Sequence, residues 1–525
     1  MGFLWWVTGL SGALVMMIEI LGSRVVGPYY GVGLYVWTSL ITVTLLALAG
    51  GYLLGGRLAD RGEAEQVLGW PLLLAGGLVL GLPLWKGVVL SASHFLGLRL
   101  GALMSTLALF GPPLVALGCV TPLIVKIAAP ERERLGRVVG GLTAISTLGS
   151  VAGTVATGFF LIPAFGVERI FQLGGTLLVL LGVACLWRAR RSTARLTFAL
   201  LAVPGWLAGE EPVAFTLSDG SGVRVVESRH SFYGHIKVVD VENGADRQRL
   251  LLIDGLNQGG VEPGGLSVTT YPYFLCFLSE LIAPSAADAL VIGLGAGLVP
   301  RCLEKNRIAV EVVEIDPVIV ELAARHFAFR PDQRVHLADA RHFLASGKGR
   351  YDLVVMDAFS GETTPGHLLD REAMGLVKAR LRPGGVFFMN LIGTLRPGHP
   401  MVPSVLHTLR RVFDQVEVVP LFDAEDTSIG NVIVMAYDGP LREPDHALVN
   451  GRPVHGNALE IVNRFLARRY HFPPGVPALL LTDDYSPLEF HDAWAKEELR
   501  KRLMASELVQ ALYRFTRFTR QEASL

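Results

Sequence analysis

Long apolar runs dominate the first part of this 525-residue chain. Each is about as long as the roughly 20 residues that a helix needs to cross the ~30 Å hydrocarbon core of a bilayer. Gly and Pro recur within the runs, as in GPPLVALGCVTPL, and membrane helices tolerate both. The runs predict a polytopic α-helical membrane domain of about six to seven spans over residues 1–209. They lie at roughly 3–22, 34–56, 69–90, 101–128, 138–165 and 170–187.

Basic residues alternate between the loops that join these runs. The loops after the second, fourth and sixth runs are rich in Arg and Lys, whereas the intervening loops carry only Arg24, Lys86, Arg99 and Arg169. The positive-inside rule therefore places the N-terminus and the basic loops in the cytoplasm. The apolar segment 196–208 is short and interrupted by proline, so we expect it to lie at the interface or to re-enter the membrane. The following domain is then cytoplasmic; if the segment crosses, that domain lies outside.

The overall composition excludes some classes of partner and site. The formal net charge is zero, which gives no indication of a nucleic-acid partner. The chain contains no CxxC motif and no His/Cys cluster, so we expect neither a metal site nor a disulfide framework, and a reducing compartment suits the second half. The four scattered cysteines are Cys119, Cys185, Cys276 and Cys302.

After Pro212 the pattern changes to short strands and amphipathic helices. The stretch 222–260 predicts three strands, with ENGADR as the turn between the last two, and hence a small β-hairpin domain over 212–265. Apolar strands then alternate with helices over 266–440, which predicts a parallel, doubly wound, Rossmann-like domain of the S-adenosylmethionine-dependent methyltransferase type. Residues 441–525 form a largely helical extension whose basic amphipathic end binds lipid, closes the domain or contacts a second copy.

A glycine-rich turn marks the first predicted ligand contact. VIGLGAG ends the first strand of the doubly wound series, so Gly293, Gly295 and Gly297 open the following helix toward a ligand. About 20 residues later, VEIDP places Glu314 and Asp316 at the tip of the second strand. We assign Glu314 to the ribose hydroxyls of a nucleoside. Asp316 is a second candidate for that contact, although Asp–Pro is also good helix-capping chemistry.

Two further acids end the next two strands. Asp339, followed by Ala340, ends the third strand in LADARHFL, and it is placed to accept a hydrogen bond from an exocyclic adenine amine. Asp357 ends the fourth strand in VVMDAFSGETTPGHLL. Acids at three successive strand ends share the carboxyl edge of one sheet, where such folds bind ligands. They predict a nucleoside ligand of the S-adenosylmethionine kind.

The order of these motifs resembles the spermidine synthase family of aminopropyltransferases over roughly residues 223–437. With the apolar runs, the chain is similar to membrane-fused spermidine synthase-like proteins. The resemblance implies a decarboxylated S-adenosylmethionine donor, an amine acceptor, methylthioadenosine as product and a homodimer. It also implies that Asp357 is the general base, because an alkylamine with a pKa near 10 must lose a proton before it attacks carbon. The motifs are ESRHSFYGHIKVVD, LLLIDGLNQ, VIGLGAG, VEIDP, LADARHFL and VVMDAFSG.

The chain departs from the family pattern around the acceptor. Ala296 stands where the family has an acid that holds the amino group of the donor, and Ser360 stands where it has a second acid, with Glu362 the nearest substitute. Replacements are sought among residues of the first hairpin, the following helix start and the TDDY stretch. Tyr233 and Tyr271 are the further catalytic candidates, and Gln258 is a donor-site candidate. The acceptor-site candidates are Tyr233, His235, Glu362, Asp484 and Tyr485. His235 is alternatively a strand surface residue, and Asp483–Asp484 alternatively caps a helix or pairs with arginines.

Other functions remain open at this point. Methyl transfer from S-adenosylmethionine itself, or cleavage or cyclisation of the donor, would use the same nucleoside site. A small-amine transporter with a nucleoside-sensing domain would need polar groups within the spans, and Glu19 is a candidate for one. A hydrogen bond between helices is the alternative role of Glu19. The acceptor, the carboxylation state of the donor and the oligomeric state do not follow from the sequence.

Overall fold

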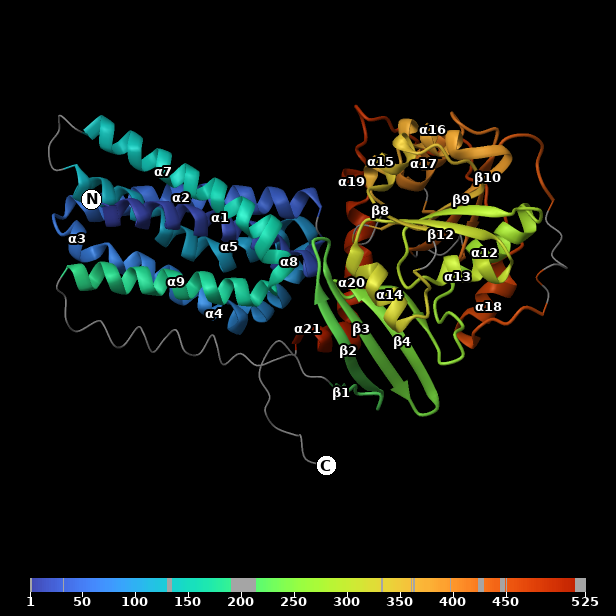
Figure 1. Cartoon of the computed structure of the whole chain (residues 1–525), viewed down its shortest axis with the longest axis horizontal. Helices are drawn as coiled ribbons and strands as arrows, with labels where there is room; N and C mark the ends of the chain where they lie inside the picture. Colours follow the sequence, from blue (N-terminus) through green and yellow to red (C-terminus); the bar gives the residue numbers. More distant parts are fainter. Residues whose placement is uncertain are drawn as a thin grey trace. The chain divides into compact units, whose positions relative to one another are not determined.

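The computed structural model describes most of the chain in two compact units (Figure 1). The first comprises Met1–Pro212 with Val509–Leu525, and the second comprises Val213–Leu508. The finer division of the second unit at residues 265 and 440 stays a prediction. The described residues are 2–31, 33–129, 135–189, 214–331, 334–359, 361, 364–396, 398–423, 429–443, 449 and 451–514.

The described part of the first unit is helical throughout. Six of its helical stretches are long and apolar enough to cross a membrane, and they coincide with the six predicted runs. These stretches are Gly2–Tyr30, Leu34–Asp60, Ala64–Ser93, Gly97–Ala128, Leu135–Leu161 and Val167–Arg188. The individual helices are α1 (Gly2–Tyr30), α2 (Leu34–Asp60), α3 (Ala64–Val67), α4 (Gly69–Ser93), η1 (His94–Leu96), α5 (Gly97–Gly118), α6 (Val120–Ala128), α7 (Leu135–Val155), η3 (Ala156–Leu161), α8 (Ile162–Ala164) and α9 (Val167–Arg188).

Small residues let α1 and α7 approach each other closely. A Cβ atom added to Gly149 of α7 would lie 2.0 Å from the Gly9 carbonyl oxygen of α1, so only glycine fits there. Such contacts are common between helices in membranes, where packing replaces the hydrophobic effect. In the same unit the side chain of Glu19 is hydrogen-bonded to Thr44 of α2. This is the helix–helix contact given above as the alternative to a transport role.

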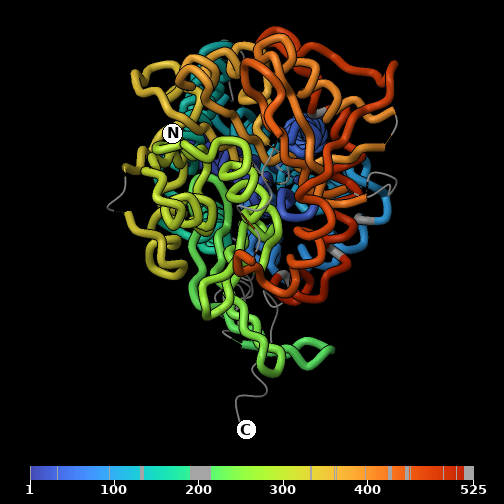
Figure 2. The backbone as a smooth tube through the Cα atoms, turned by 90° about the vertical axis from the view of Figure 1, so that its right-hand side faces the viewer, coloured from blue at the N-terminus to red at the C-terminus, as the bar shows by residue number. Residues whose placement is uncertain are grey.

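The second unit begins with a five-stranded antiparallel sheet in the order β1-β2-β3-β4-β5. The predicted turn between β3 and β4 is confirmed, because Asn243 pairs with Asp246 across it. The prediction of three strands is wrong: a further turn at Asp254–Gly255, where both residues have positive φ, separates β4 from β5. Figure 2 follows the same backbone as a tube, with this sheet in green. The strands are β1 (Ala214–Thr216), β2 (Gly222–His230), β3 (His235–Asn243), β4 (Asp246–Ile253) and β5 (Leu256–Val261).

The rest of this unit is built on a seven-stranded sheet in the order β11-β12-β10-β9-β6-β7-β8. All neighbours are parallel except β12, which runs antiparallel to β10 and β11. This order is that of the S-adenosylmethionine-dependent methyltransferase type, and it confirms the predicted doubly wound fold. The strands are β6 (Asp288–Ile292), β7 (Ala309–Glu314), β8 (Arg334–Leu337), β9 (Tyr351–Met356), β10 (Leu381–Gly393), β11 (Gln415–Pro420) and β12 (Gly430–Tyr437).

Side chains alternate between two cores on the two faces of this sheet. Val291 and Val355 belong to one core, whereas Leu290 and Val354 belong to the other. The helices α12 (Tyr271–Ile282), α13 (Leu298–Lys305), α14 (Pro317–His326) and α18 (Gly456–Phe465) pack on the first face. The second face is covered by α15 (Ala340–Ser346), α16 (Arg371–Arg380) and α17 (Met401–Leu409). The other described helices of this unit are η5 (Gly366–Leu368), α19 (Leu488–His491) and α20 (Ala493–Ala505), and α21 (Glu507–Arg514) begins at its end and belongs mostly to the first unit.

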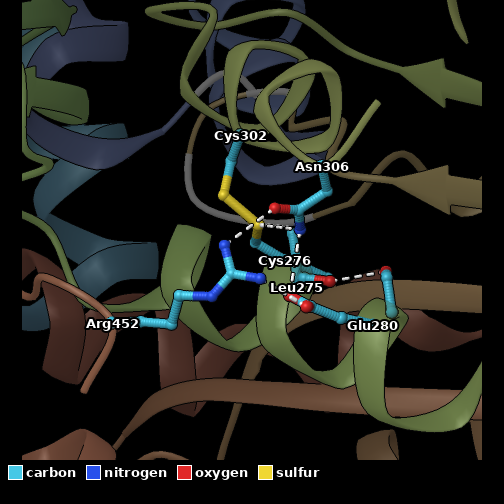
Figure 3. Close-up of a disulfide and its surroundings, with 7 residues drawn as sticks. Leu275, Cys276, Glu280, Cys302, Asn306 and Arg452 are labelled. Carbon is cyan, nitrogen blue, oxygen red and sulfur yellow. Dashed lines mark hydrogen bonds and ion pairs between the residues drawn. A yellow bond between two sulfur atoms is a disulfide. The ribbon is translucent and has the colours of Figure 1, made fainter. Parts of the chain in front are cut away.

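A disulfide joins α12 to α13 (Figure 3). Cys276 and Cys302 are 26 residues apart in the sequence, and the ring that they close contains the glycine-rich turn. Beside it, Asn306 donates a hydrogen bond to Glu280, which is also paired with Arg452. The prediction that the cysteines form no disulfide is therefore wrong. Their spacing gave no sign of it, because the pairing depends on two helices that pack side by side on one face of the sheet.

Candidate active site

The site lies at the carboxyl edge of the seven-stranded sheet, where the strand order reverses between β6 and β9. At this switch point the glycine-rich turn after β6 lies against the loop that begins at Asp357 after β9, the acid loop. The Asp357 N–H donates to the Ile292 carbonyl oxygen at 2.8 Å. A Cβ atom on Gly293, whose φ is +90°, would lie 2.3 Å from the Asp357 carbonyl oxygen. Glycine at this position therefore allows the close approach of the two loops.

Glu314 ends β7 with its carboxylate directed into the glycine-rich turn. One oxygen accepts the Leu294 N–H at 2.9 Å, and the other accepts the Asp316 N–H at 2.9 Å. Burial raises the pKa of Glu314 above its ordinary value, although these two hydrogen bonds oppose the increase. A carboxylate oxygen has a second lone pair, so both oxygens can still accept a hydroxyl proton from a ligand.

The next two acids both cap helices. Asp316 is the N-cap of α14 and accepts the Val318 N–H at 2.9 Å, as its sequence context predicted. Asp339 is the N-cap of α15 and accepts the His342 N–H at 2.9 Å. Ala340 is the first residue of that helix.

The second oxygen of Asp339 has a partner that the sequence did not indicate. His367, in the loop that follows Asp357, lies with its Nε2 3.1 Å from Asp339 Oδ2. Partial burial disfavours ionisation of Asp339, but the hydrogen bonds from His342 and His367 outweigh it and lower the pKa of Asp339. The acid loop is thus connected to the third strand end through a side chain.

Asp357 is held by side chains rather than by a helix N-terminus. Asn390 Nδ2, from β10, donates to Asp357 Oδ1 at 2.9 Å. The Tyr271 hydroxyl, at the start of α12, donates to the Gln258 carbonyl oxygen at 3.2 Å and lies beside the same carboxylate. Burial raises the pKa of Asp357 to about 6, against the opposing effect of Asn390 and Tyr271. A carboxylate with this pKa is ionised at neutral pH and can still accept a proton there.

Strand β5 closes the other side of the glycine-rich turn. The Gln258 carbonyl oxygen would lie 2.9 Å from a Cβ atom on Gly295, so the backbone of β5 touches this turn. Ala296 is 1% exposed and packs against Gly259. The residue that replaces the family's acid is therefore enclosed between the turn and β5. At the helix start, Gly297 has a left-handed conformation with φ +70° and acts as the N-cap of α13.

The two tyrosine candidates belong to different parts of the site. Tyr271 contacts Asp357, as described. Tyr233, in the turn between β2 and β3, is 43% exposed. Burial raises the pKa of Tyr233, and the negative charges of Asp316, Asp339 and Glu314 raise it further. Tyr233 therefore lies near the donor acids.

His235 faces the neighbouring strand. Its ring stacks on His230, with centroids 4.0 Å apart, and its Nε2 lies 2.8 Å from Ser228 Oγ. These contacts match the alternative prediction of a strand surface residue. Glu362 and Ser360 lie outside the described residues.

The TDDY stretch forms a tight turn in which Thr482 and Tyr485 pair with each other. Asp483 pairs with Arg341, the second residue of α15, and Arg341 also binds Asp370. The predicted pairing of this stretch with an arginine is confirmed for Asp483. Asp484 and Tyr485, at the tip of the turn, are exposed. Asp370, Asp483 and Glu372 lie close enough for a metal ion, but the first two are paired with Arg341 and Glu372 is paired with Arg371.

Three polar residues of the site escaped the sequence analysis: His367, Asn390 and Asn431. Asn390 interrupts the apolar strand sequence VFFMNLIG, and this isolated amide is the signal that could have identified it. His367 and Asn431 stand in sequences with no comparable signal.

Comparison with known proteins agrees with this geometry. The profile of the spermine/spermidine synthase domain matches residues 272–422. A polyamine aminopropyltransferase of Vibrio vulnificus is 31% identical over 227 residues, which cover 41% of this chain and 74% of that protein. This chain belongs to the spermidine synthase family of aminopropyltransferases.

Two further proteins match parts of this chain, one over a shorter stretch and one at lower sequence identity. A probable polyamine aminopropyl transferase of Bifidobacterium longum is 30% identical over 165 residues, 31% of this chain and 36% of that protein. The crystal structure of a probable spermidine synthase from Corynebacterium glutamicum covers 50% of this chain and 98% of its own, with 19% identity and a TM-score of 0.40. The family match falls within the second unit, which carries every candidate residue of the site.

Proposed function

We propose that this protein is a membrane-anchored aminopropyltransferase that transfers the aminopropyl group of decarboxylated S-adenosylmethionine to an amine and releases methylthioadenosine. The observation that carries the proposal is the Asp357 carboxylate. Its pKa is raised to about 6, and the main chain of Asp357 touches the glycine-rich turn at the switch point of the sheet.

The donor is held by the first three strand ends. Glu314 accepts hydrogen bonds from the ribose hydroxyls, and Asp339 accepts one from the adenine amine. The turn formed by Gly293, Gly295 and Gly297, together with the backbones of Gln258 and Ala340, lines the nucleoside. Asp316 serves mainly as the N-cap of α14 and adds negative charge beside the cationic sulfonium.

The reaction is a single displacement at carbon. The lone pair of the neutral amine attacks the methylene carbon next to the sulfonium, a C–N bond forms, and the C–S bond breaks with its electrons going to sulfur. Asp357 accepts the proton that the nitrogen loses. Since Asp357 must be ionised, activity falls as the pH drops through about 6.

The acceptor is an amine that approaches from the acid-loop side. Tyr271 orients Asp357 from that side. The exposed Asp484 and Tyr485, with Glu362, Tyr233 and His235, are the candidates for binding the far end of the acceptor. Negative and hydroxyl-bearing side chains suit a polyamine-like cation.

The six apolar helical stretches anchor the enzyme in a membrane, with the catalytic unit on the side of the basic loops, the cytoplasm. The Cys276–Cys302 disulfide bears on this placement, because stable disulfides are rare in reducing compartments. Cys276 is 0% exposed, so thiols are alkylated at the moment the cells are denatured, with and without prior reduction, to test the placement. Labelling of these two cysteines without prior reduction supports the cytoplasm, and protection until reduction contradicts it.

Product analysis of the purified full chain tests the function. The enzyme is incubated separately with S-adenosylmethionine and with its decarboxylated form, each with a panel of primary diamines, and products are identified by mass spectrometry. Methylthioadenosine with an aminopropylated amine, from the decarboxylated donor only, is the expected result. Methylated amine with S-adenosylhomocysteine, or methylthioadenosine without any amine product, would replace the proposal by methyl transfer or donor cleavage.

A further inference from the structure

Two amides, one buried and one half-buried, stand behind Asp357 in a continuous chain of hydrogen bonds. Asn390 Nδ2 donates to Asp357 Oδ1 at 2.9 Å, and Asn431 Nδ2 donates to Asn390 Oδ1 at 2.9 Å. Asn390 is 0% exposed. The three residues come from the neighbouring strands β9, β10 and β12, so the chain runs across the sheet beneath its carboxyl edge.

The register of the sheet fixes this alignment. Met389 of β10 pairs with Met356 of β9, which sets Asn390 level with Asp357. In the antiparallel pair, Asn390 faces Ile433 and Asn431 faces Ile392, so the two amides are diagonal neighbours on one face. That face is the one covered by α12, whose first residue is Tyr271.

The direction of each hydrogen bond decides what Asp357 meets. An asparagine amide presents either its NH₂ group or its oxygen, and in a buried site only its partners fix the choice. Because the Asn431 NH₂ group occupies the Asn390 oxygen, the Asn390 NH₂ group is left facing Asp357. A reversed Asn390 would set its oxygen against the carboxylate and would disfavour the ionised acid.

A buried amide such as that of Asn390 is a costly way to fill a sheet interior. Moving an amide out of water is unfavourable unless its hydrogen bonds are made, and the gain over an apolar pair is small. The neighbouring strand positions of β10 and β12 are apolar, as in VFFMNLIG and NVIVMAY. The position of the pair directly behind Asp357 points to a role in the chemistry.

We propose that Asn390 and Asn431 are positioning residues that hold the Asp357 carboxylate ionised and in one orientation, with Oδ2 turned toward the amine. This inference rests on the proposed function. Among the described residues, the titratable group in contact with the carboxylate is the Tyr271 hydroxyl from α12, and Asn390 is the contact from the sheet.

The test measures the pH dependence of kcat/KM for methylthioadenosine formation by the full chain. Asn390→Leu removes the hydrogen-bond donor at nearly constant side-chain volume. We expect the acidic limb of the pH profile to move to higher pH by about one unit, so that kcat/KM at pH values below the limb falls about tenfold. Asn431→Leu is expected to move the limb in the same direction by a smaller amount. An unchanged limb in both variants would overturn the inference.

Thr408→Val is the matched control. Thr408 is a buried hydroxyl that donates to the Ser404 carbonyl oxygen and accepts the Leu481 N–H, and it does not contact Asp357. Its loss is expected to lower the melting temperature without moving the acidic limb. A limb that moves equally in Thr408→Val would reduce the amide pair to a structural role.

A second measurement does not depend on activity. Asn390→Leu should lower the melting temperature more at pH 8, where Asp357 is ionised, than at pH 5, and this difference should disappear when Asp357→Asn is also present. If Asn390→Leu fails to fold, Asn431→Leu is read in the same way. A pH-independent loss contradicts the inference. If the variants show this stability pattern but the wild-type protein forms no methylthioadenosine, the proposed function is contradicted instead.

Discussion

The donor side and the acceptor side of this site hold their acids by different means. On the donor side the acids accept main-chain N–H groups. Glu314 accepts from Asp316 and from Leu294 in the glycine-rich turn, and Asp316 and Asp339 each accept from the helix that they cap. On the acceptor side, Asp357 is held by the side chains of Asn390 and Tyr271, which come from distant parts of the sequence.

This difference has a chemical consequence. Main-chain donors at helix N-termini favour the charged carboxylate, as in Asp339, whose pKa is lowered, and this suits an acid that only accepts hydrogen bonds. Burial raises the pKa of Glu314 despite its two main-chain donors. Asp357 has fewer such donors, and burial raises its pKa to about 6. A base needs that balance, because it must be ionised before the reaction and must take a proton during it. The comparison can be tested by changing one side at a time.

Asp357→Asn should have the largest effect. We expect methylthioadenosine formation to fall by about 10²- to 10⁴-fold, because no carboxylate remains to accept the proton, while donor binding measured by calorimetry persists. The variant should also melt at a higher temperature at pH 8, since the raised pKa of Asp357 means that the ionised form destabilises the fold above about pH 6. Asp352→Asn, at the opposite end of β9, is the control that should retain activity. Equal losses in both variants would contradict this role.

Glu314→Gln should weaken the donor side. We expect the Kd for the sulfonium nucleoside to rise by about 10- to 100-fold, since a charged acceptor for the ribose is lost and one amide N–H now faces a main-chain N–H. The acidic limb of the pH profile should stay in place, because Asp357 is untouched. Calorimetry and a pH profile check the two parts, and unchanged affinity would remove Glu314 from the ribose site.

Tyr271→Phe should have a moderate effect on the acceptor side. Loss of the hydroxyl removes a polar group that lowers the pKa of Asp357, so we expect kcat to fall by about three- to tenfold and the acidic limb to move to higher pH. Tyr273→Phe, on the same helix, removes a hydroxyl that donates to the Ser267 carbonyl oxygen at 2.8 Å. That control should leave the limb unchanged, and a matching shift in both variants would count against a role for Tyr271.

Removal of the disulfide should affect stability more than catalysis. Replacing both Cys276 and Cys302 by alanine is expected to lower the free energy of unfolding by about 2–4 kcal/mol and to weaken donor binding only slightly. Denaturant unfolding and calorimetry measure the two effects. A variant in which Cys119 and Cys185 are replaced should keep the sensitivity of the wild type to dithiol reductants. Insensitivity of the wild type itself would show that the bond does not stabilise the unit.

The same contrast explains what could be predicted from the sequence. The apolar runs, the acids at strand ends and the Asp316 cap depend on residues that lie close together in the chain, and each was predicted. The turn at Asp254–Gly255 is equally local, but the apolar residues on both sides of it also fit one long strand, so the sequence pattern does not separate β4 from β5.

The contacts that were not predicted all join distant segments. Asn390 reaches Asp357 only after β10 aligns beside β9, and Asn431 requires the antiparallel return of β12. Cys276 and Cys302 meet because α12 and α13 share a face of the sheet. Such pairings are set by packing and register, which the local pattern of residues does not encode.

The most direct test of the account is the stoichiometry of the products. The purified full chain is given decarboxylated S-adenosylmethionine and an isotope-labelled diamine, and both products are counted by mass spectrometry at pH 8. We expect one aminopropylated diamine for each methylthioadenosine, and about 10²- to 10⁴-fold less of both from Asp357→Asn. Methylthioadenosine that accumulates without labelled product, or equal turnover by Asp357→Asn, would contradict aminopropyl transfer with Asp357 as the base.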